Sequence, residues 1–512
     1  MKFRVFIQLT GIVLAFATEL SAQSFVENAL LFSRTKPGGS ARIQALGGTQ
    51  VALGGDFSSA LSNPAGLGMY NRSEFTFSPA LNFFNSDASH RGTTQKESNS
   101  KFTIPGLSYV FNSPQNKDGF WGGSFGISMT RTNDFNSFMQ YGGNDNVSSI
   151  IDWFIQDAQG QSEDDLLNSD FPTGLAYSNF LLEDSTFYGG PSRSYFSFLG
   201  LYPDPDDIRH LKRQGSVKTK GAQYQWSLAY GGNYLDKIFF GASVGITTLR
   251  YTFTSTYSES DFFFELDPNF NPLDNLSMEE TIDIQGSGVN LTLGVLFRPV
   301  DFVQVGASFV TPTYYQLTDS YTAKVSTLWN DYEYPVTGEI LNRESYESYE
   351  PVIAEYNLST PMKLSLGTAF FISEYGFISG DIEFVNYRKP KYTSDISGIS
   401  FNSDNDAIRT SYKSTINYRI GAEFRYEMLR LRAGYNFLSN PYNTSAVDTN
   451  QSIQTISAGV GVRLAQFFID FALMRSTGNR EYSSYVLQNN TGPRVDITNT
   501  LVSGMATVGF TF

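Results

Sequence analysis

The sequence predicts an all-β fold: a 14-stranded antiparallel transmembrane β-barrel with an N-terminal hatch, or plug, of small residues inside its lumen. Three observations support this class. Segments of about ten residues alternate between apolar residues and polar or glycine residues. Short and long connections alternate along the chain, as they do in outer-membrane barrels. The last segment ends on an aromatic residue, Phe512, that belongs to its apolar row.

Composition narrows the function classes. The net charge of −14, with no basic stripe, argues against a nucleic-acid partner. The chain has no cysteine, which excludes disulfides, thiolate catalysis, cysteine metal sites and a lipid-modified cysteine. His90 and His210 are the only histidines, so neither a histidine-rich metal centre nor a Ser-His-Asp arrangement is expected. We therefore expect no cofactor, no metal and no enzyme activity.

The N-terminus predicts export. Lys2 and Arg4 precede an apolar run, and Ala22 offers a small residue before a cleavage point. The alternative, a membrane anchor, is disfavoured because the apolar run is shorter than the ~20 residues of a spanning helix. Residues 1–22 are predicted to be a signal peptide, which places the mature chain in the outer membrane.

Residues 23–72 are predicted to form the hatch. The stretch "ALGGDFSSALSNPAGLGMY" is too rich in glycine for a strand and too broken for a helix. A barrel of about fourteen strands has a lumen too wide for side chains alone to fill, so it conducts water unless it is plugged. Pro64 fixes its own φ, and Asn63 can bond to neighbouring backbone and hold a turn. The alternative is a simple turn before the first strand.

Residues 73–512 are predicted to form the barrel. A soluble sandwich would also alternate, but it gives no reason for short and long connections to take turns. Residues 132–220 form one large outer insertion, either an ordered loop with short helices that covers the barrel mouth or a loop without a role. The predicted strands are 73–84, 102–111, 119–131, 221–233, 238–256, 281–298, 302–325, 356–373, 376–392, 413–426, 429–440, 453–464, 467–476 and 495–512.

Charged residues cluster on the inward row of the later strands, because alternation keeps them off the lipid face. They either brace the wall and the hatch, or bind the carboxylate of a ligand through their guanidinium groups. The set comprises Asp381, Glu383, Arg419, Glu423, Arg425, Arg430, Arg432 and Arg463.

The segment "GGSARIQALGGTQVALGGDFSSALSNPAGLGMY" resembles the hatch of the FadL/TodX (OMPP1) family of outer-membrane transporters, and most of all its Bacteroidetes-type subgroup. The matching motif is Asn63, Pro64, Ala65 and Gly66. The resemblance implies passive transport of small hydrophobic compounds, such as long-chain fatty acids or aromatic hydrocarbons. It also implies lateral release into the bilayer beside a kinked strand, for which Gly122 and Gly123 are the best candidates because paired glycines mark bends.

The alternative function is a barrel of the same family that binds protein partners and assists secretion or surface attachment. For either function we expect a monomer in contact with outer-membrane lipid, inserted by the barrel-assembly machinery. An apolar pocket that touches the hatch would favour transport, whereas a lumen blocked by packed polar side chains would favour partner binding.

Overall fold

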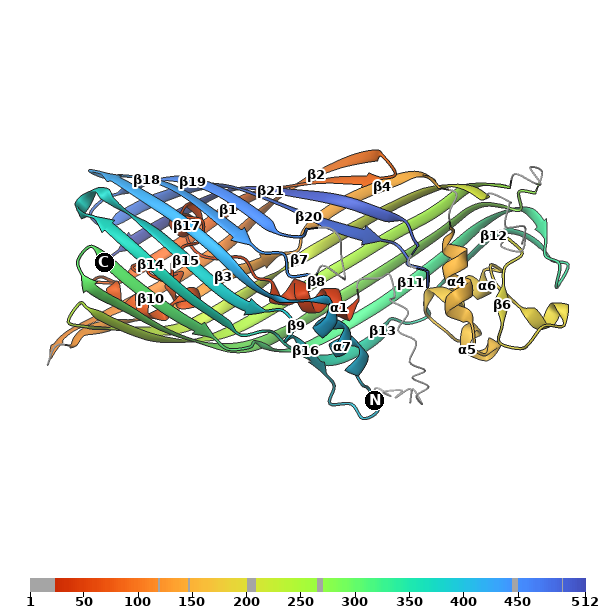
Figure 1. Cartoon of the computed structure of the whole chain (residues 1–512), viewed down its shortest axis with the longest axis horizontal. Helices are drawn as coiled ribbons and strands as arrows, with labels where there is room; N and C mark the ends of the chain where they lie inside the picture. Colours follow the sequence, from red (N-terminus) through yellow and green to blue (C-terminus); the bar gives the residue numbers. More distant parts are fainter. Residues whose placement is uncertain are drawn as a thin grey trace, which may run out of the picture.

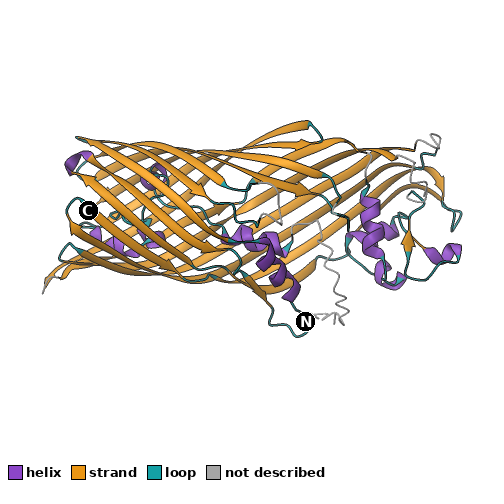
Figure 2. Ribbon diagram, in the orientation of Figure 1, coloured by secondary structure: helices purple, strands orange, loops and turns teal. Residues whose placement is uncertain are grey.

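The computed structural model describes residues 24–117, 120–145, 148–199, 209–264, 270–443, 450–489 and 491–512. The predicted signal peptide, residues 1–22, lies outside the described residues. The described chain forms one closed antiparallel sheet, drawn as a long barrel in Figures 1 and 2. The barrel closes where the first strand pairs with both the second and the last, with Glu74 opposite Thr511.

Fourteen wall strands are present in the described residues, and the predicted fold class is confirmed. Several wall strands are interrupted and therefore carry two labels. They are β1 (Glu74–His90), β2 (Thr93–Lys117), β3 with β4 (Phe120–Asp134, Ser137–Asp145), β7 (Arg209–Tyr234), β8 (Ile238–Phe264), β9 (Leu273–Val300), β10 with β11 (Val303–Val310, Tyr314–Glu333), β13 with β14 (Val352–Ser359, Lys363–Ile372), β15 with β16 (Gly376–Asn386, Lys391–Thr393), β17 (Ser414–Tyr426), β18 (Leu429–Leu438), β19 (Ile453–Arg463), β20 (Phe467–Ser483) and β21 (Arg494–Thr511). β12 (Ile340–Glu347) lengthens β11 into an outer hairpin.

The strands run further outward than predicted. The first two strands were predicted over 73–84 and 102–111, with a long loop between them, and that loop prediction is wrong. β1 and β2 continue through residues 85–101 as a paired hairpin and meet at a turn of Arg91 and Gly92. Both turn residues have positive φ, 44° and 81°, as a tight two-residue hairpin turn requires. The inward residues Ser86, Ala88 and His90 are buried, but both rows of this hairpin consist mainly of polar or small residues, such as Lys96 and Ser98. The sequence therefore shows no apolar alternation there.

Alternation divides each strand between two environments. Large apolar side chains form the outward row, and Phe83, Val244 and Leu293 are about half exposed there. Ser124, Ser227 and Thr292 point inward and are buried. An outward apolar band with an inward polar row is the pattern of a barrel that faces lipid. No helix in the described part of the chain is both long and apolar enough to span a membrane.

The N-terminal elements lie inside the barrel (Figure 1, red). They are α1 (Phe25–Ser33), α2 (Ala41–Ala45), α3 (Ser59–Ser62) and η1 (Pro64–Met69). Ser24 and Ser40 cap the first two helices, accepting hydrogen bonds from the backbone N–H of Glu27 and Ile43. Packing joins α2 to β18–β21 and η1 to β3 and β7–β9, so the hatch touches opposite walls.

Residues 148–199, here named the outer cap, fold over the outer end of the barrel. The outer cap contains α4 (Ile150–Ala158), α5 (Glu163–Leu167), α6 (Pro172–Ser178), β5 (Glu183–Asp184), η2 (Ser185–Tyr188) and β6 (Tyr195–Phe196). A capping box at Ser149 begins α4, whose Ile151 and Phe154 are fully buried. These side chains join one apolar core with α1 and with inward residues of β8, β9 and β11. The outer half of the lumen is therefore filled.

The cap is attached to the wall by buried polar contacts. Glu259 on β8 accepts hydrogen bonds from the Ser149 hydroxyl at 2.5 Å and from the Ile150 N–H at 3.0 Å. Asn179, at the end of α6, donates to the Val325 carbonyl on β11 at 3.1 Å. The cap thus spans from one wall strand to another. Outside the cap, α7 (Asn402–Ser411) follows β16, and η3 (Ser373–Tyr375) makes the short turn between β14 and β15.

Candidate functional site

The predicted motif, Asn63 to Gly66, lies against the wall at the inner end of the hatch. The Asn63 amide donates to the Val51 carbonyl at 2.6 Å and to the Val295 carbonyl of β9 at 3.2 Å. Its side-chain oxygen accepts from the Ala65 N–H at 3.3 Å. Asn63 is fully buried and joins two hatch segments to one wall strand. Pro64 begins η1, where its missing N–H costs nothing.

Wall glycines make room for this backbone. A Cβ on Gly294 would lie 1.8 Å from the Asn63 side-chain oxygen, and one on Gly241 would lie 2.4 Å from the Pro64 carbonyl carbon. The same holds around the barrel, where a Cβ on Gly306 would lie 2.0 Å from the Val51 carbonyl oxygen. The hatch therefore packs by its backbone onto the wall, which only residues without a side chain permit. The wall glycines in such contact are Gly231, Gly241, Gly294, Gly306, Gly367, Gly421, Gly434 and Gly459.

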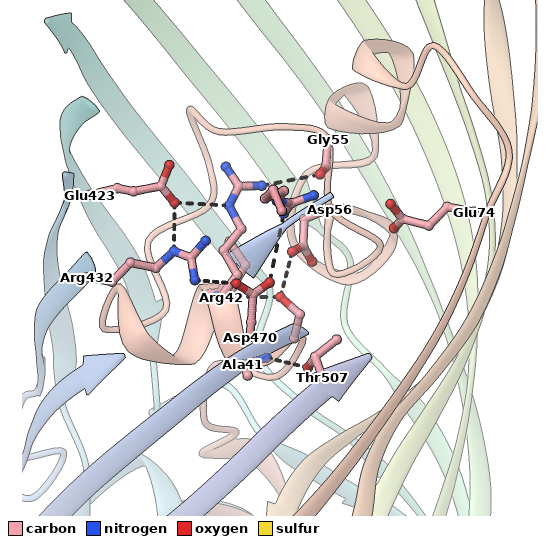
Figure 3. A network of polar contacts seen from close by, with 12 residues as sticks. Ala41, Arg42, Gly55, Asp56, Glu74, Glu423, Arg432, Asp470 and Thr507 are labelled. Atoms are coloured by element: carbon pink, nitrogen blue, oxygen red, sulfur yellow. Dashed lines mark hydrogen bonds and ion pairs between the residues drawn. The ribbon is translucent and has the colours of Figure 1, made fainter. Parts of the chain in front are cut away.

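A buried charge network joins the hatch to the later strands (Figure 3). Arg432 on β18 is 2.7 Å from Glu423 on β17 and 2.6 Å from Asp470 on β20. Arg42 of α2 approaches the same Glu423 at 3.6 Å and donates to the Gly54 and Gly55 carbonyls. The side chains of Arg432, Glu423 and Asp470 are at most 2% exposed. Each carboxylate thus has a cation, as buried charges require.

Two more predicted arginines border this network and one lies apart from it. Arg425 is 2.7 Å from Glu423, and Arg463 is 3.9 Å from Asp470; both side chains are about one-third exposed. Arg430 instead donates to the Glu427 and Leu429 carbonyls at a short turn. Its guanidinium holds a turn and does not face the hatch.

The remaining predicted charges form a second group. Arg419 on β17 is 3.0 Å from Glu383 on β15, which also accepts from Asn417 at 2.9 Å. Asp381 accepts from the backbone N–H groups of Gln50 and Val51 at 2.7 and 3.0 Å. Asp381 thus holds the hatch backbone directly. This geometry is what a bracing role requires, since the carboxylates of the wall already occupy the buried guanidinium groups.

The wall itself is interrupted between its second and third strands. In the described residues, β2 pairs with β3 only from Gly106 onward, and β4 pairs with β7 alone. Residues 93–105 of β2 thus pair only with β1, and we call this stretch the wall break. Side chains cross it: Lys101 donates to Asn136 at 2.9 Å, and Asn82 donates to Asp134 at 3.1 Å.

The third strand changes direction at the wall break. Its register with β7 shifts between Arg131 and Asn133, and the strand stops at Phe135 before β4 begins. The hatch is bonded to this bend: the Lys36 N–H donates to the Thr132 carbonyl at 3.0 Å, and Asn133 donates to the Leu31 carbonyl at 3.0 Å. Hatch and bend are therefore one connected unit.

Cavities lie on both sides of the wall break. A groove of about 1380 Å³ follows the outer face, and a lumen cavity of about 130 Å³ lies against the hatch. Thr103 and Arg131 line both. A second lumen cavity of about 100 Å³ shares Lys36 with the first and is lined mainly by polar side chains. The described part of the lumen holds no group of three acidic or histidine side chains placed to bind a metal ion.

The predicted kink pair, Gly122 and Gly123, lies near the opposite end of the third strand. Both residues keep partners on β2 and on β7, with an irregularity beside Gly122. Sequence reasoning missed the wall break, although Pro105 gave a signal. Proline cannot donate to a ladder and is confined to edges and bulges. Arg42 and Asp470 were also missed, because no local pattern distinguishes a charge that finds its partner across the barrel.

Comparison with known proteins bears on the fold. No protein-family model matches the sequence, and no curated protein matches it significantly. A Pseudomonas aeruginosa FadL homologue has a similar structure, with a TM-score of 0.55 and 12% identity, over 93% of this chain and 99% of that one. The Pseudomonas putida toluene transporter TodX gives a TM-score of 0.49 at 15% identity, over 93% and 99% of the two chains. The chain therefore has the FadL-type barrel fold, as the sequence resemblance predicted.

Proposed function

We propose that this chain is an outer-membrane channel for small hydrophobic compounds, which leave the lumen sideways through the wall break. The observation that carries this proposal is the pair of cavities, one in the lumen and one on the outer face, that are separated by Thr103 and Arg131, which line both. Beside the hatch, neighbouring strands such as β7 and β8 are joined by a backbone ladder, whereas at the break the described residues of β2 are joined to the third strand by side chains. A few side-chain hydrogen bonds break and re-form far more easily than a row of backbone hydrogen bonds between two strands.

The apolar surface of the outer lumen supports entry of a hydrophobic compound from the outer end of the barrel. Inward residues of β8, β9 and β11 are apolar here, including Phe253, Ile284 and Leu317. A water-filled pore has a polar interior, so this surface suits a hydrophobic solute better than an ion. In the proposed path the outer cap moves aside, the compound enters against these residues, and the hatch directs it to the break.

The substrate class follows by analogy with proteins of the same fold. The solved structures with this fold include a FadL homologue and a toluene transporter. We propose aromatic hydrocarbons or long-chain fatty acids as substrates. The hatch then acts as a gate, seated on wall glycines and held by Asp381 and the network around Glu423. No energy coupling is required, because the compounds move down their concentration gradient.

Uptake tests this function. Cells that produce the chain should accumulate labelled toluene or oleate faster than cells that lack it, and cells that produce an unrelated closed barrel serve as the control. Equal rates for every compound of both classes would contradict transport.

A second function, binding of a protein partner at the outer face, is favoured by one feature. The tip of the outer cap carries an aromatic cluster in which Phe187 and Tyr188 are 42% and 66% exposed. Exposed aromatic clusters on a surface mark interaction sites. Substituting both residues by serine would abolish partner capture but leave uptake unchanged if the two functions are separate.

A further inference from the structure

A basic patch lies on the outside of the barrel wall, beside the wall break. Lys218 and Lys220 on β7 and Arg250 on β8 point outward and are exposed. Lys220 pairs with Thr252, two residues from Arg250, so the three cations occupy neighbouring positions on one face. A carboxylate, Asp283 on β9, lies beside them and accepts a hydrogen bond from Thr252. In a chain of net charge −14, three cations beside this carboxylate leave a local excess of positive charge, which points to an anionic partner.

The outer groove of about 1380 Å³ adjoins this patch. Its lower rim is apolar and aromatic: Phe77, Phe102 and Trp226 line it and are 37%, 65% and 42% exposed. Arg250 lines its upper rim, and so does Lys101 across the wall break. The acidic residues of the groove, Glu355 and Asp395, lie at its other end, beyond β11. The groove is thus cationic at the end nearest the break.

The height of the cations selects the kind of anion. Trp226 lies at the upper edge of the apolar band, and Arg250 pairs with Ala222, which is four residues before Trp226 on β7, toward the outer end of that strand. At ~3.3 Å per residue and a tilt of ~40°, Arg250 lies ~10 Å above Trp226, Lys220 ~15 Å and Lys218 ~20 Å. A phospholipid headgroup layer is only ~5–8 Å deep. The cations therefore extend beyond it, to the height of a bulky sugar headgroup.

We propose that this groove binds a phosphorylated glycolipid of the outer leaflet. The acyl chains lie along Phe102 and Trp226, where they continue the lipid-facing band. The phosphates contact Arg250 and Lys220, and Lys218 adds positive charge above them. The site does not depend on transport: it uses only the outward face of the wall. Its position means that a bound lipid borders the wall break on the membrane side.

Lipid binding to the purified full-length protein tests this site. The probe is bisphosphorylated lipid A, titrated into the detergent-solubilised protein and followed by native mass spectrometry. Replacing Lys218, Lys220 and Arg250 by glutamine should weaken binding by at least about tenfold, because each cation near a charged headgroup contributes on the order of 1 kcal/mol. The matched control is Lys324→Gln, which removes an exposed cation on β11 that is paired with Glu347.

Two further lipids decide the chemistry. Dephosphorylated lipid A should bind the wild-type protein as weakly as lipid A binds the triple variant. Phosphatidylglycerol should bind more weakly than lipid A, because it carries one phosphate in a thin headgroup and does not reach Lys220. Because all three cations are exposed, the triple variant should keep the heat resistance of the folded barrel. Equal lipid A affinity in the triple variant and the wild type, or equal affinity for all three lipids, would overturn the proposal.

Discussion

At the scale of single residues, the tightest contact between the hatch and the wall is that between Asn63 and Gly294. A Gly294→Ala substitution places a methyl group 1.8 Å from the Asn63 side-chain oxygen, so the hatch has to move away from β9. We expect the barrel to remain folded but to leak small ions, which single-channel conductance in planar bilayers would measure. The matched control is Gly504→Ala on β21, where a Cβ meets no atom within 4 Å. Equal conductance in the two variants would contradict the claim that the contact with Gly294 holds the hatch in place.

Asp157, in the outer cap, predicts a pH dependence. Burial raises the pKa of its carboxyl above the ordinary value of 3.8, although Thr173 donates a hydrogen bond to it. The folded cap therefore binds the proton more tightly than the unfolded cap. Cap stability falls as the pH rises from 3.8 through the raised pKa, and it is recovered on acidification.

The test is Asp157→Asn, which removes the ionised state. At neutral pH we expect slower hydrogen exchange of the α4 amides in the variant than in the wild type. Below the unfolded pKa the two should exchange alike, after correction for the intrinsic rate. Asp164→Asn, on the exposed start of α5, serves as the control and should change nothing at either pH. A wild-type cap that is more protected at neutral pH than at acidic pH would contradict the sign.

For each contact between the hatch and the wall, the sequence identified one of the two residues and not its partner. Asn63 and Pro64 were recognisable because a turn needs their backbone properties. Gly294 was not, because it lies in an ordinary alternating strand and its role depends on a residue distant in the sequence. The same reason explains why Glu423 and Arg432 were predicted as inward charges, while their hatch partner Arg42 was not.

At the scale of elements, the charge network fixes α2 to strands β17, β18 and β20. Glu423→Gln leaves Arg42 and Arg432 short of a carboxylate at a site where the Glu423 side chain is 2% exposed. Breaking a buried pair in this way costs about 3–5 kcal/mol. We expect the variant to lose its folded-barrel gel mobility at a markedly lower temperature than the wild type.

Arg430→Gln is the matched control, since that guanidinium bonds only to turn carbonyls. It should change the free energy of unfolding by no more than ~0.5 kcal/mol, as other surface substitutions do. Loss of heat resistance in Glu423→Gln with uptake retained would assign the network to bracing. Loss of fatty-acid uptake with heat resistance retained would instead assign it to ligand binding.

The strands themselves were largely predictable, because each carries its own alternation of apolar and polar residues. β9 and β21 alternate over most of their length, and both lie where the pattern placed them. The outer ends of β1 and β2 were missed because their buried inward residues, Ser86, Ala88 and His90, are polar or small, so no apolar alternation marks them in the sequence. The wall break was missed because it depends on how two strands pair. The alternation of residues within one strand does not show which residues of the next strand it pairs with.

At the scale of the whole molecule, the lumen is divided into two halves of opposite character. The outer half is an apolar core shared by the outer cap and α1, and the inner half is a backbone-packed hatch held by buried charges. Alternation predicts that one face of each strand points inward, but not what fills the space. The inward residues of the outer wall and the helices of the outer cap are both apolar, as a lid would require. Only the fold shows that the two surfaces pack together.

The wall break is the feature on which the proposed route depends, and it can be tested by locking it. The chain has no cysteine, so Lys101→Cys with Asn136→Cys introduces the only two thiols, in place of side chains that are 2.9 Å apart. A reducible bifunctional thiol reagent should stop uptake of toluene or oleate, and a reductant should restore it.

The control pair is Ser108→Cys with Ser128→Cys, which face each other where β2 and β3 are already paired. Cross-linking there should leave uptake unchanged, because no path crosses a closed ladder. Full uptake with the wall break locked would mean that the compound leaves by another route, and that the side-chain contacts at the wall break only complete the wall.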